Sequence, residues 1–275
     1  MLKKTVLDNG FIIQKPFNHH LQTLVDYYFY LDIPVSQLKL QEEHVIPFPR
    51  ITFGYFFDHP FSVTNHTANE TVTANMVISR IATDQISVKP LTDRVKIIGA
   101  HVRPYTLVFL TDENISKLPW LIDTENLFGN RAKRFKRDVE NCATPQDMFA
   151  EVENIFLKTI LDKDLSTIIK AVRLIESKKG EIALATLSEK LNLSNRTLRN
   201  HFYRALGCSP KDYIQLVKLK QSIFQMKHSA DNLTEVTYSQ NYADQAHFTN
   251  TVKNLTGESP KDIRKKMPDF RFLQF

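Results

Sequence analysis

The chain has 275 residues, of which 42% are hydrophobic, so it can bury one large core or two smaller ones. Its two cysteines, Cys142 and Cys208, form no C-x-x-C pair, which excludes a disulfide framework and a cysteine-based zinc finger and fits a reducing cytoplasm. The net charge is +6, and the positive excess lies in residues 171–275, which contain 17 Lys+Arg and 10 Asp+Glu. Residues 1–170 contain 19 Lys+Arg and 20 Asp+Glu. This distribution predicts either a polyanionic partner for the second half or an ordinary solvated surface.

The first half of the chain predicts β-strands. The stretches rich in β-branched and aromatic residues are "VDYYFYLDI", "RITFGYFF", "ETVTANMVIS" and "VKIIGAHV". Helical signals begin after about residue 112, and Thr144 followed by Pro145 marks one helix start. The sequence therefore predicts an α+β protein, whose first part is a mainly-β barrel or sandwich, with a cupin-like barrel as one form, and flanking helices.

The second half predicts seven helices and one repeated unit. In "LNLSNRTLRNHFYRALG", Asn192 suits the left-handed position of a tight turn and Ser194 suits a helix N-cap. Leu198 and Phe202 form the apolar side of the helix that follows. A short helix, a turn and a polar second helix form a helix-turn-helix.

The same pattern returns fifty residues later in "NYADQAHFTNTVKNLTG", where Asn241 takes the place of Asn192. Each unit exits through a nearly identical joint, "GCSPKD" at 207–212 and "GESPKD" at 257–262. Gly ends one helix, and Ser-Pro begins the next. The stretch "KDYIQLVKLKQSIFQMK" then predicts a long helix that links the two units, with Phe224 among the residues available for packing.

These residues resemble the DNA-binding domain of AraC/XylS-type transcription regulators. The signature is "LNLSNRTLRNHFYRALGCSPKDYIQLVKLKQS" followed by "YADQAHFTNTVKNLTGESPKDIRK". The sequence departs from the family where Asn192 and Asn241 replace glycine, where Val236-Thr237 replaces Ile-Ala, and where Val252 replaces an aromatic residue. The resemblance implies domains at 1–162 and 163–275, the second with helix-turn-helix units at 181–207 and 231–257.

The first half resembles, less specifically, a domain that precedes this DNA-binding domain in other regulators. The matching stretches are "VKIIGAHVRPYT", "LIDTENLFGNRAKRF" and "ATPQDMFAEVE". In such regulators this domain senses a ligand, dimerises, or does both. A small-molecule effector and a monomer or homodimer are therefore expected. Within "HVRPY", Arg103 and Tyr105 are the candidate ligand contacts, with a structural ion pair as the alternative role of Arg103.

The resemblance implies double-stranded DNA as the main partner. Two rigidly joined reading helices can enter successive major grooves, roughly 34 Å apart. The expected base contacts are Arg196, Thr197, Arg199, Asn200, Gln245, His247, Thr249 and Asn250. The expected phosphate contacts are Ser194, Lys211, Lys253, Ser259 and Lys261. Arginine pairs with guanine, and asparagine or glutamine with adenine, so these residue types suit the role.

Other features point to no further chemistry. The nine histidines are scattered, so no metal or other cofactor is expected, and the basic run "RAKRFKR" suits a solvated helix face. No signal peptide or apolar membrane span is evident in the sequence, so we expect a cytoplasmic protein without a membrane partner. A transcription regulator, not an enzyme, is the leading hypothesis. The alternatives are a β-barrel enzyme with an accessory helical domain and a module that recruits RNA polymerase.

Overall fold

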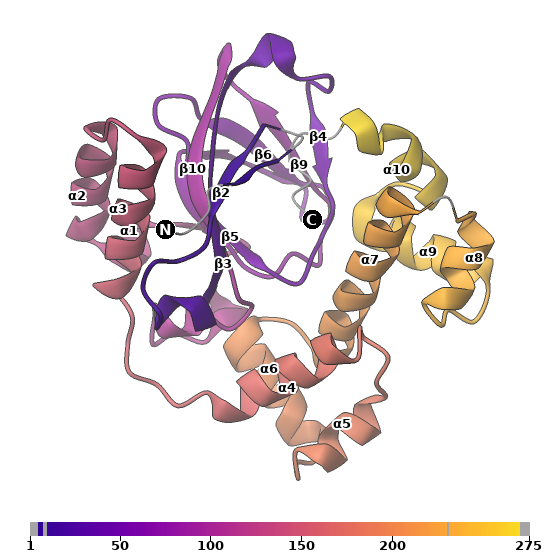
Figure 1. Cartoon of the computed structure of the whole chain (residues 1–275). Coiled ribbons are helices and arrows are strands. Elements are labelled where there is room, and N and C mark those ends of the chain that lie inside the picture. Colours follow the sequence, from indigo (N-terminus) through magenta and orange to yellow (C-terminus); the bar gives the residue numbers. More distant parts are fainter. Residues whose placement is uncertain (1–4, 8–9, 230, 270–275) are drawn as a thin grey trace.

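The computed structural model describes residues 5–7, 10–229 and 231–269, with strands in the first half and helices in the second (Figure 1). In chain order the strands are β1 (Thr5–Val6), β2 (Ile12–Gln14), β3 (Val25–Pro34), β4 (Glu43–Val45), β5 (Ile51–Tyr55), β6 (Phe61–Asn65), β7 (Glu70–Ala74), β8 (Met76–Ser79), β9 (Ile86–Pro90), β10 (Arg94–Val102) and β11 (Leu121–Asp123). The α-helices are α1 (Glu125–Phe128), α2 (Asn130–Glu140), α3 (Pro145–Leu157), α4 (Ser166–Ser177), α5 (Leu184–Lys190), α6 (Asn195–Leu206), α7 (Pro210–His228), α8 (Leu233–Ser239), α9 (Gln245–Thr256) and α10 (Pro260–Lys266). Short 3-10 turns include η3 (Leu107–Phe109) and η4 (Ile115–Lys117).

The strands form two antiparallel sheets around an apolar interior, which confirms the predicted mainly-β first part. One sheet has the order β1-β2-β3-β10-β5-β8-β11, and the other has the order β4-β9-β6-β7. The long strands β3 and β10 pair along their whole length, from Arg94 opposite Pro34 to Val102 opposite Val25. This central pair gives the larger sheet a rigid middle on which both flanking layers pack.

The predicted strand "ETVTANMVIS" is two strands in the structure. β7 ends at Ala74 in the smaller sheet and β8 begins at Met76 in the larger one. Between them Asn75 turns the chain, and its side-chain amide donates a hydrogen bond to the Phe57 carbonyl at 2.9 Å. The expectation of one continuous strand was wrong, because both segments have the same β-forming composition and only the sheet exchange separates them.

The two faces of the larger sheet bury different side chains. Phe53 points toward α1–α3, where its ring meets those of Phe128, Phe135 and Phe156. On the opposite face, residues such as Phe29 belong to a second cluster shared with the smaller sheet. The helices α1–α3 thus cover one side of the sheet, as Figure 1 shows, and leave the space between the sheets to the other side.

The helical second half wraps around one end and one side of the sheets (Figure 1). Its first helices share one continuous apolar core with the larger sheet, which includes Leu198, Phe202 and Tyr213. The last helices have a core of their own, into which Ile46 of the first half inserts. The boundary expected between residues 162 and 163 falls between α3 and α4 and stays a prediction.

The linking helix α7 is present as predicted, but not every apolar side chain on it packs. Tyr213, Leu216 and Leu219 are fully buried. Phe224 was expected to be available for packing, and the structure leaves it 51% exposed, with its ring beside that of His228. A helix that joins two units covers them with part of its circumference only, so the remaining face stays in solvent.

Candidate nucleic-acid interface and the neighbouring cavity

The first helix-turn-helix consists of α5 and α6. The turn passes through Asn192, whose φ of 52° lies in the left-handed region that asparagine tolerates. Helix α6 begins after Ser194, whose hydroxyl accepts a hydrogen bond from the Thr197 N–H at 3.0 Å. Leu198 and Phe202 are fully buried, so α6 packs through one face and presents the other to solvent.

The exposed face of α6 carries the first group of expected base contacts. Arg196, Arg199 and Asn200 are exposed, and within the described ranges no hydrogen bond or ion pair engages their side chains. Thr197 is half-buried, and its hydroxyl lies 2.8 Å from that of Ser194, so it takes part in the helix cap. Tyr203 extends this face by a turn and is 42% exposed. The face therefore offers two cations, an amide and a phenol.

The second helix-turn-helix, α8 and α9, repeats this geometry with one difference. Asn241 has a φ of 51°, and Phe248 and Val252 are fully buried, as the repeat predicted. The cap of α9 is Asp244, whose carboxylate accepts a hydrogen bond from the His247 N–H at 2.7 Å. A carboxylate at this helix start repels phosphate, so the negative charge at the start of α9 is unfavourable for DNA binding there.

The expected base contacts of α9 lie on its exposed side. Gln245, His247 and Asn250 are exposed, and Thr249 is half-buried. The Nδ1 atom of His247 lies 3.5 Å from the Ala243 N–H and accepts from it.

The expected phosphate contacts differ in what their side chains already bind. Lys211, Lys253 and Lys261 are exposed near helix ends. The hydroxyl of Ser259 accepts from the Asp262 N–H at 3.2 Å and donates to the Asp262 carboxylate at 2.6 Å. A phosphate at Ser259 would therefore meet this carboxylate, whereas Ser194 has no carboxylate in its cap.

The two repeated joints have the same backbone conformation. Gly207 and Gly257 end α6 and α9 with φ of 76° and 79°, a region that side chains with a Cβ rarely adopt. Ser209 and Ser259 then cap α7 and α10. The structure thereby confirms that α6 and α9 both end in the same kind of joint.

A cavity of about 210 Å³ lies between the two sheets. Its apolar walls include Phe11, Phe29, Phe61, Val63, Val88, Ile97 and Trp120. Its polar groups are few and include Arg50, Arg80, Asp84 and His101. Gly207, at the first joint, also borders it, so the cavity reaches the helical half of the chain. Mostly apolar walls with a few polar anchors are typical of small-molecule sites.

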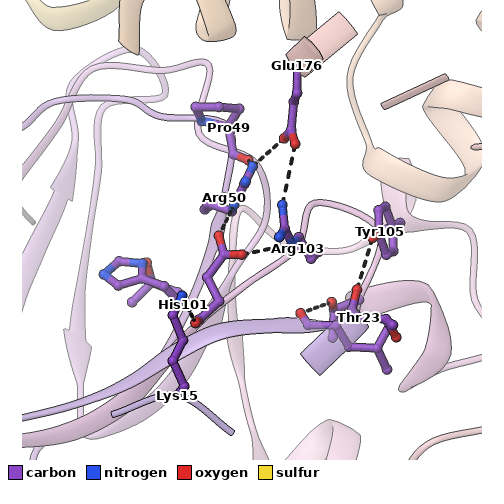
Figure 2. A network of polar contacts seen from close by, with 12 residues as sticks. Lys15, Thr23, Pro49, Arg50, His101, Arg103, Tyr105 and Glu176 are labelled. Carbon is purple, nitrogen blue, oxygen red and sulfur yellow. Dashed lines mark hydrogen bonds and ion pairs between the residues drawn. The ribbon is translucent and has the colours of Figure 1, made fainter. Parts of the chain in front are cut away.

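Arg103 and Tyr105 were the candidate ligand contacts, but neither is among the residues that line this cavity. Arg103 lies 2.8 Å from the Asp26 carboxylate and 3.4 Å from that of Glu176, and the Tyr105 hydroxyl donates to a backbone carbonyl at 3.0 Å (Figure 2). Both side chains therefore have internal partners, and for Arg103 the geometry is that of the structural ion pair. From the same stretch, His101 borders the cavity.

The ion pairs around Arg103 join the two halves of the chain (Figure 2). Arg50 is buried and pairs with Asp26 of β3 and with Glu176 of α4. Burial alone would raise the pKa of Asp26, but the guanidinium groups of Arg50 and Arg103 outweigh burial and hold this pKa below its ordinary value of 3.8. The Tyr213 hydroxyl of α7 also donates to Glu176 at 2.7 Å. We call Asp26, Arg50, Arg103 and Glu176 the ionic network.

Arg80 is the other cation at the cavity, and its environment differs from that of Arg50. Burial lowers the pKa of Arg80, and Asp84 opposes this shift. Its Nη1 atom lies 3.4 Å and 3.3 Å from the carbonyl oxygens of Ile115 and Ser116, and within the described residues no carboxylate lies at ion-pair distance. Nearby Cys208 is buried, which raises its pKa and suits a packing role.

Sequence reasoning missed several of these residues, and only one of them carried a local signal. Asp244 was detectable, because an acidic residue directly before a helical stretch is a common N-cap. Arg80 and Glu176 were not, because their partners lie in distant segments and carry no local pattern. Nothing in the spacing along the chain brings Arg50 and Glu176 together.

No group of three or more His, Cys, Asp or Glu side chains arranged to hold a metal ion occurs among the residues that the structure describes. Over the same residues, no helix combines the length and the apolar character needed to cross a membrane.

The comparisons with known proteins show what the helix-turn-helix pair is similar to. Residues 187–266 match the model of the helix-turn-helix domain family. The HTH-type transcriptional activator RhaS of Escherichia coli O139:H28 is 22% identical over 140 residues, which is 49% of this chain and 50% of RhaS. RhaS of Escherichia fergusonii is 25% identical over 160 residues, which is 53% and 57%. The chain spans about half the length of these relatives, and the resemblance to AraC/XylS-type regulators is confirmed for this region.

Solved structures of ToxT from Vibrio cholerae share the overall fold. One of them has a TM-score of 0.51 at 13% identity and covers 86% of this chain and 98% of ToxT. Another, of ToxT with a bound unsaturated fatty acid, has a TM-score of 0.51 at 14% identity and covers 86% and 94%. The arrangement of a mainly-β first part followed by two helix-turn-helix units is therefore one that known proteins adopt.

Proposed function

We propose that the protein is a sequence-specific, DNA-binding transcription regulator. The observation that carries the proposal is the pair of helix-turn-helix units, each with a second helix that exposes side chains of types able to bind base edges. Arg196, Arg199 and Asn200 have no intramolecular partner within the described ranges, so they are free to bind a ligand that is not part of the chain. The major groove admits such helices, and arginine and amide side chains distinguish base pairs there.

In this proposal α6 and α9 read bases and the surrounding lysines bind phosphates. The base contacts are Arg196, Thr197, Arg199, Asn200, Gln245, His247, Thr249 and Asn250. The phosphate contacts are Ser194, Lys211, Lys253, Ser259 and Lys261. Because Asp244 caps α9 whereas the neutral Ser194 caps α6, the first unit supplies more of the affinity. A partner of this kind places the protein with the chromosome, in the cytoplasm.

A β-barrel enzyme was the alternative, and the similar proteins favour regulation. Both RhaS proteins are transcriptional activators. Some polar side chains that border the cavity already bind neighbouring residues. Arg50, for example, pairs with Asp26 and Glu176. Recruitment of RNA polymerase, and the choice between a monomer and a homodimer, belong to the same proposal.

The salt dependence of DNA binding tests this function. The full chain is titrated against a duplex selected from random sequences, at several salt concentrations. If Lys211, Lys253 and Lys261 each neutralise a phosphate, the slope of log affinity against log salt is roughly −3, because each contact contributes about −0.9. An affinity that does not change with salt would contradict DNA binding through this surface.

We also propose that the cavity binds an apolar carboxylic acid as effector. The walls are mostly apolar, and Arg80 is a cation at the cavity without an ion-pair partner among the described residues. A carboxylate on a slender apolar chain satisfies both features, and a structure of ToxT is described with an unsaturated fatty acid bound. A partly buried cation such as Arg80 gains from a charged, hydrogen-bonded partner.

The single tryptophan of the chain makes this second proposal measurable. Trp120 borders the cavity, so its fluorescence should change in a saturable way when oleate binds. Oleyl alcohol has the same chain without the charge and should bind at least about tenfold more weakly, as expected for loss of a charge-assisted hydrogen bond. Equal responses to both compounds would show that Arg80 does not bind the carboxylate. The absence of a saturable response to either compound would contradict the proposal that the cavity binds an effector of this kind.

A further inference from the structure

One short segment of the first half touches both repeated joints. Residues Arg80–Gln85 connect β8 of the larger sheet with β9 of the smaller sheet and have no regular secondary structure. We call this segment the bridge. Because it passes from one sheet to the other, it closes the space between them on the side where the helical half packs.

The first end of the bridge lies beside the first joint. Arg80 Nη1 contacts the carbonyl oxygens of η4, which packs against α6. A Cβ placed on Gly207 would lie 3.4 Å from this same Nη1 atom, and Arg80 and Gly207 line the same cavity, so Arg80 lies beside the joint. The Arg80 N–H is held in turn by the Trp120 carbonyl at 3.0 Å.

The second end of the bridge holds the second joint. The side-chain amide of Gln85 donates to the carbonyl oxygens of Lys253 and Asn254, at 3.4 Å and 3.3 Å, in the last turn of α9. A Cβ placed on Gly257 would lie 3.1 Å from Gln85 Oε1. The Gln85 backbone is fixed to the loop after β6, where its carbonyl accepts from the His66 N–H at 2.8 Å.

Between these ends the bridge borders the cavity. Ile81, Ala82, Thr83 and Asp84 all line it. In the described ranges no backbone hydrogen bond holds these four residues, and the Asp84 carboxylate is bound by the Asn65 side chain at 2.9 Å. A segment pinned at both ends and free of backbone hydrogen bonds in its middle is one that a neighbouring molecule can displace at low cost.

We propose that the bridge couples the cavity to both reading helices through the two joints. The inference rests on the proposed effector function for its ligand, and it deepens that function by naming the coupling element. A molecule that presses on Ile81–Asp84 moves Arg80 and Gln85 together, because only four residues separate them. Each joint sets the exit of a reading helix, so α6 and α9 respond as a pair.

Hydrogen exchange in the full-length protein tests the coupling without any ligand. Arg80→Met and Gln85→Met keep the length of each side chain and remove its donors. Gln22→Met is the matched control, because Gln22 also donates its amide to a backbone carbonyl, that of Pro16 at 3.3 Å, within the first half. Exchange is followed in peptides that cover residues 203–209 and 253–259.

The coupling predicts an effect at the far joint. Gln85→Met should raise exchange at 203–209, and Arg80→Met should raise it at 253–259, each by about fivefold, whereas Gln22→Met changes neither. Inserting two glycines between Ala82 and Thr83 keeps both end contacts. In a protein with this insertion, each substitution should no longer raise exchange at the more distant joint. If Arg80→Met does not fold, Gln85→Met alone decides. Substitutions that affect only the nearer joint would overturn the proposal.

Hydrogen exchange with oleate present tests the coupling proposal and the effector proposal separately. If Trp120 fluorescence reports binding, exchange at both joints should change together in the unaltered protein and separately in the glycine-insertion variant. Binding that leaves both joints unchanged would overturn the bridge and leave the cavity site standing. If the substitutions raise exchange at the more distant joint without ligand, but Trp120 fluorescence does not respond to oleate, the coupling through the bridge is supported. The proposal of a carboxylic-acid effector is then contradicted.

Discussion

At the scale of single residues, the exposed cations of the helical half differ in the helix on which they lie. Arg199 follows the fully buried Leu198 on α6, so its side chain leaves the helix on the side away from the core. Lys261 lies in the first turn of α10, outside both reading helices. The first position suits a base edge in the groove, and the second suits the DNA backbone.

These positions predict two different binding defects. Arg199→Ala should weaken binding to the selected site by about 1–3 kcal/mol, the value of a bidentate contact with guanine, and should change binding to random DNA little. Lys261→Ala should weaken binding to both DNAs and reduce the salt slope by about one unit. Both side chains are exposed, so the free energy of unfolding should stay within about 0.5 kcal/mol.

Titrations of both variants on both DNAs, at several salt concentrations, measure these effects. Lys163→Ala serves as a control, because Lys163 binds backbone carbonyls and Asp112 in the first half of the chain. If Arg199→Ala weakened binding to the two DNAs equally, α6 would not be a base-reading helix.

At the scale of elements, local patterns were sufficient wherever neighbours along the chain decide the conformation. Asn192 and Asn241 adopt the left-handed turn, and Gly207 and Gly257 end the reading helices, because these residues tolerate a positive φ that others resist. The spacing of Leu198 and Phe202 likewise determines which side of α6 is buried, so the exposed side of this helix follows from the amino-acid pattern alone.

Elements whose limits depend on distant partners could not be predicted in this way. The exchange of sheets at Asn75 has no signal in composition, because β7 and β8 are equally rich in β-forming residues. The cavity is another example, since its walls come from strands of both sheets, from the bridge and from Gly207. The guess that placed Arg103 at a ligand relied on its local sequence, whereas its partner Glu176 lies on a helix of the other half.

At the scale of the whole molecule, the ionic network is a charged contact between the first half of the chain and α4, the helix that precedes the first helix-turn-helix unit. Asp26, Arg50 and Arg103 belong to the first half, and Glu176 lies on α4. Two guanidinium groups face two carboxylates, so their charges balance. Because Arg50 also borders the cavity, this contact lies next to the proposed effector site.

This balance predicts a pH-dependent loss of stability in Asp26→Asn. The substitution leaves Arg50 buried with one carboxylate, and removal of one partner from a buried pair costs about 3–5 kcal/mol. The pKa of Asp26 is lowered in the folded protein, so its contribution is fully present above the ordinary value of 3.8 and is lost as pH falls through the lower, folded value. The difference between the two proteins should therefore be constant near neutral pH and shrink only below about 3.8.

Urea unfolding across this pH range measures the difference, and Asp32→Asn is the matched control. Asp32 also lies on β3 and also pairs with an arginine, but its partner Arg94 is 54% exposed and belongs to the same half. Solvent screens that pair, so its loss should cost at most about 1 kcal/mol. Only Asp26→Asn should loosen α4 from the strands, which hydrogen exchange in peptides from α4 would report. Equal losses of stability in the two variants, with α4 equally protected in both, would show that the ionic network does not hold the two halves together.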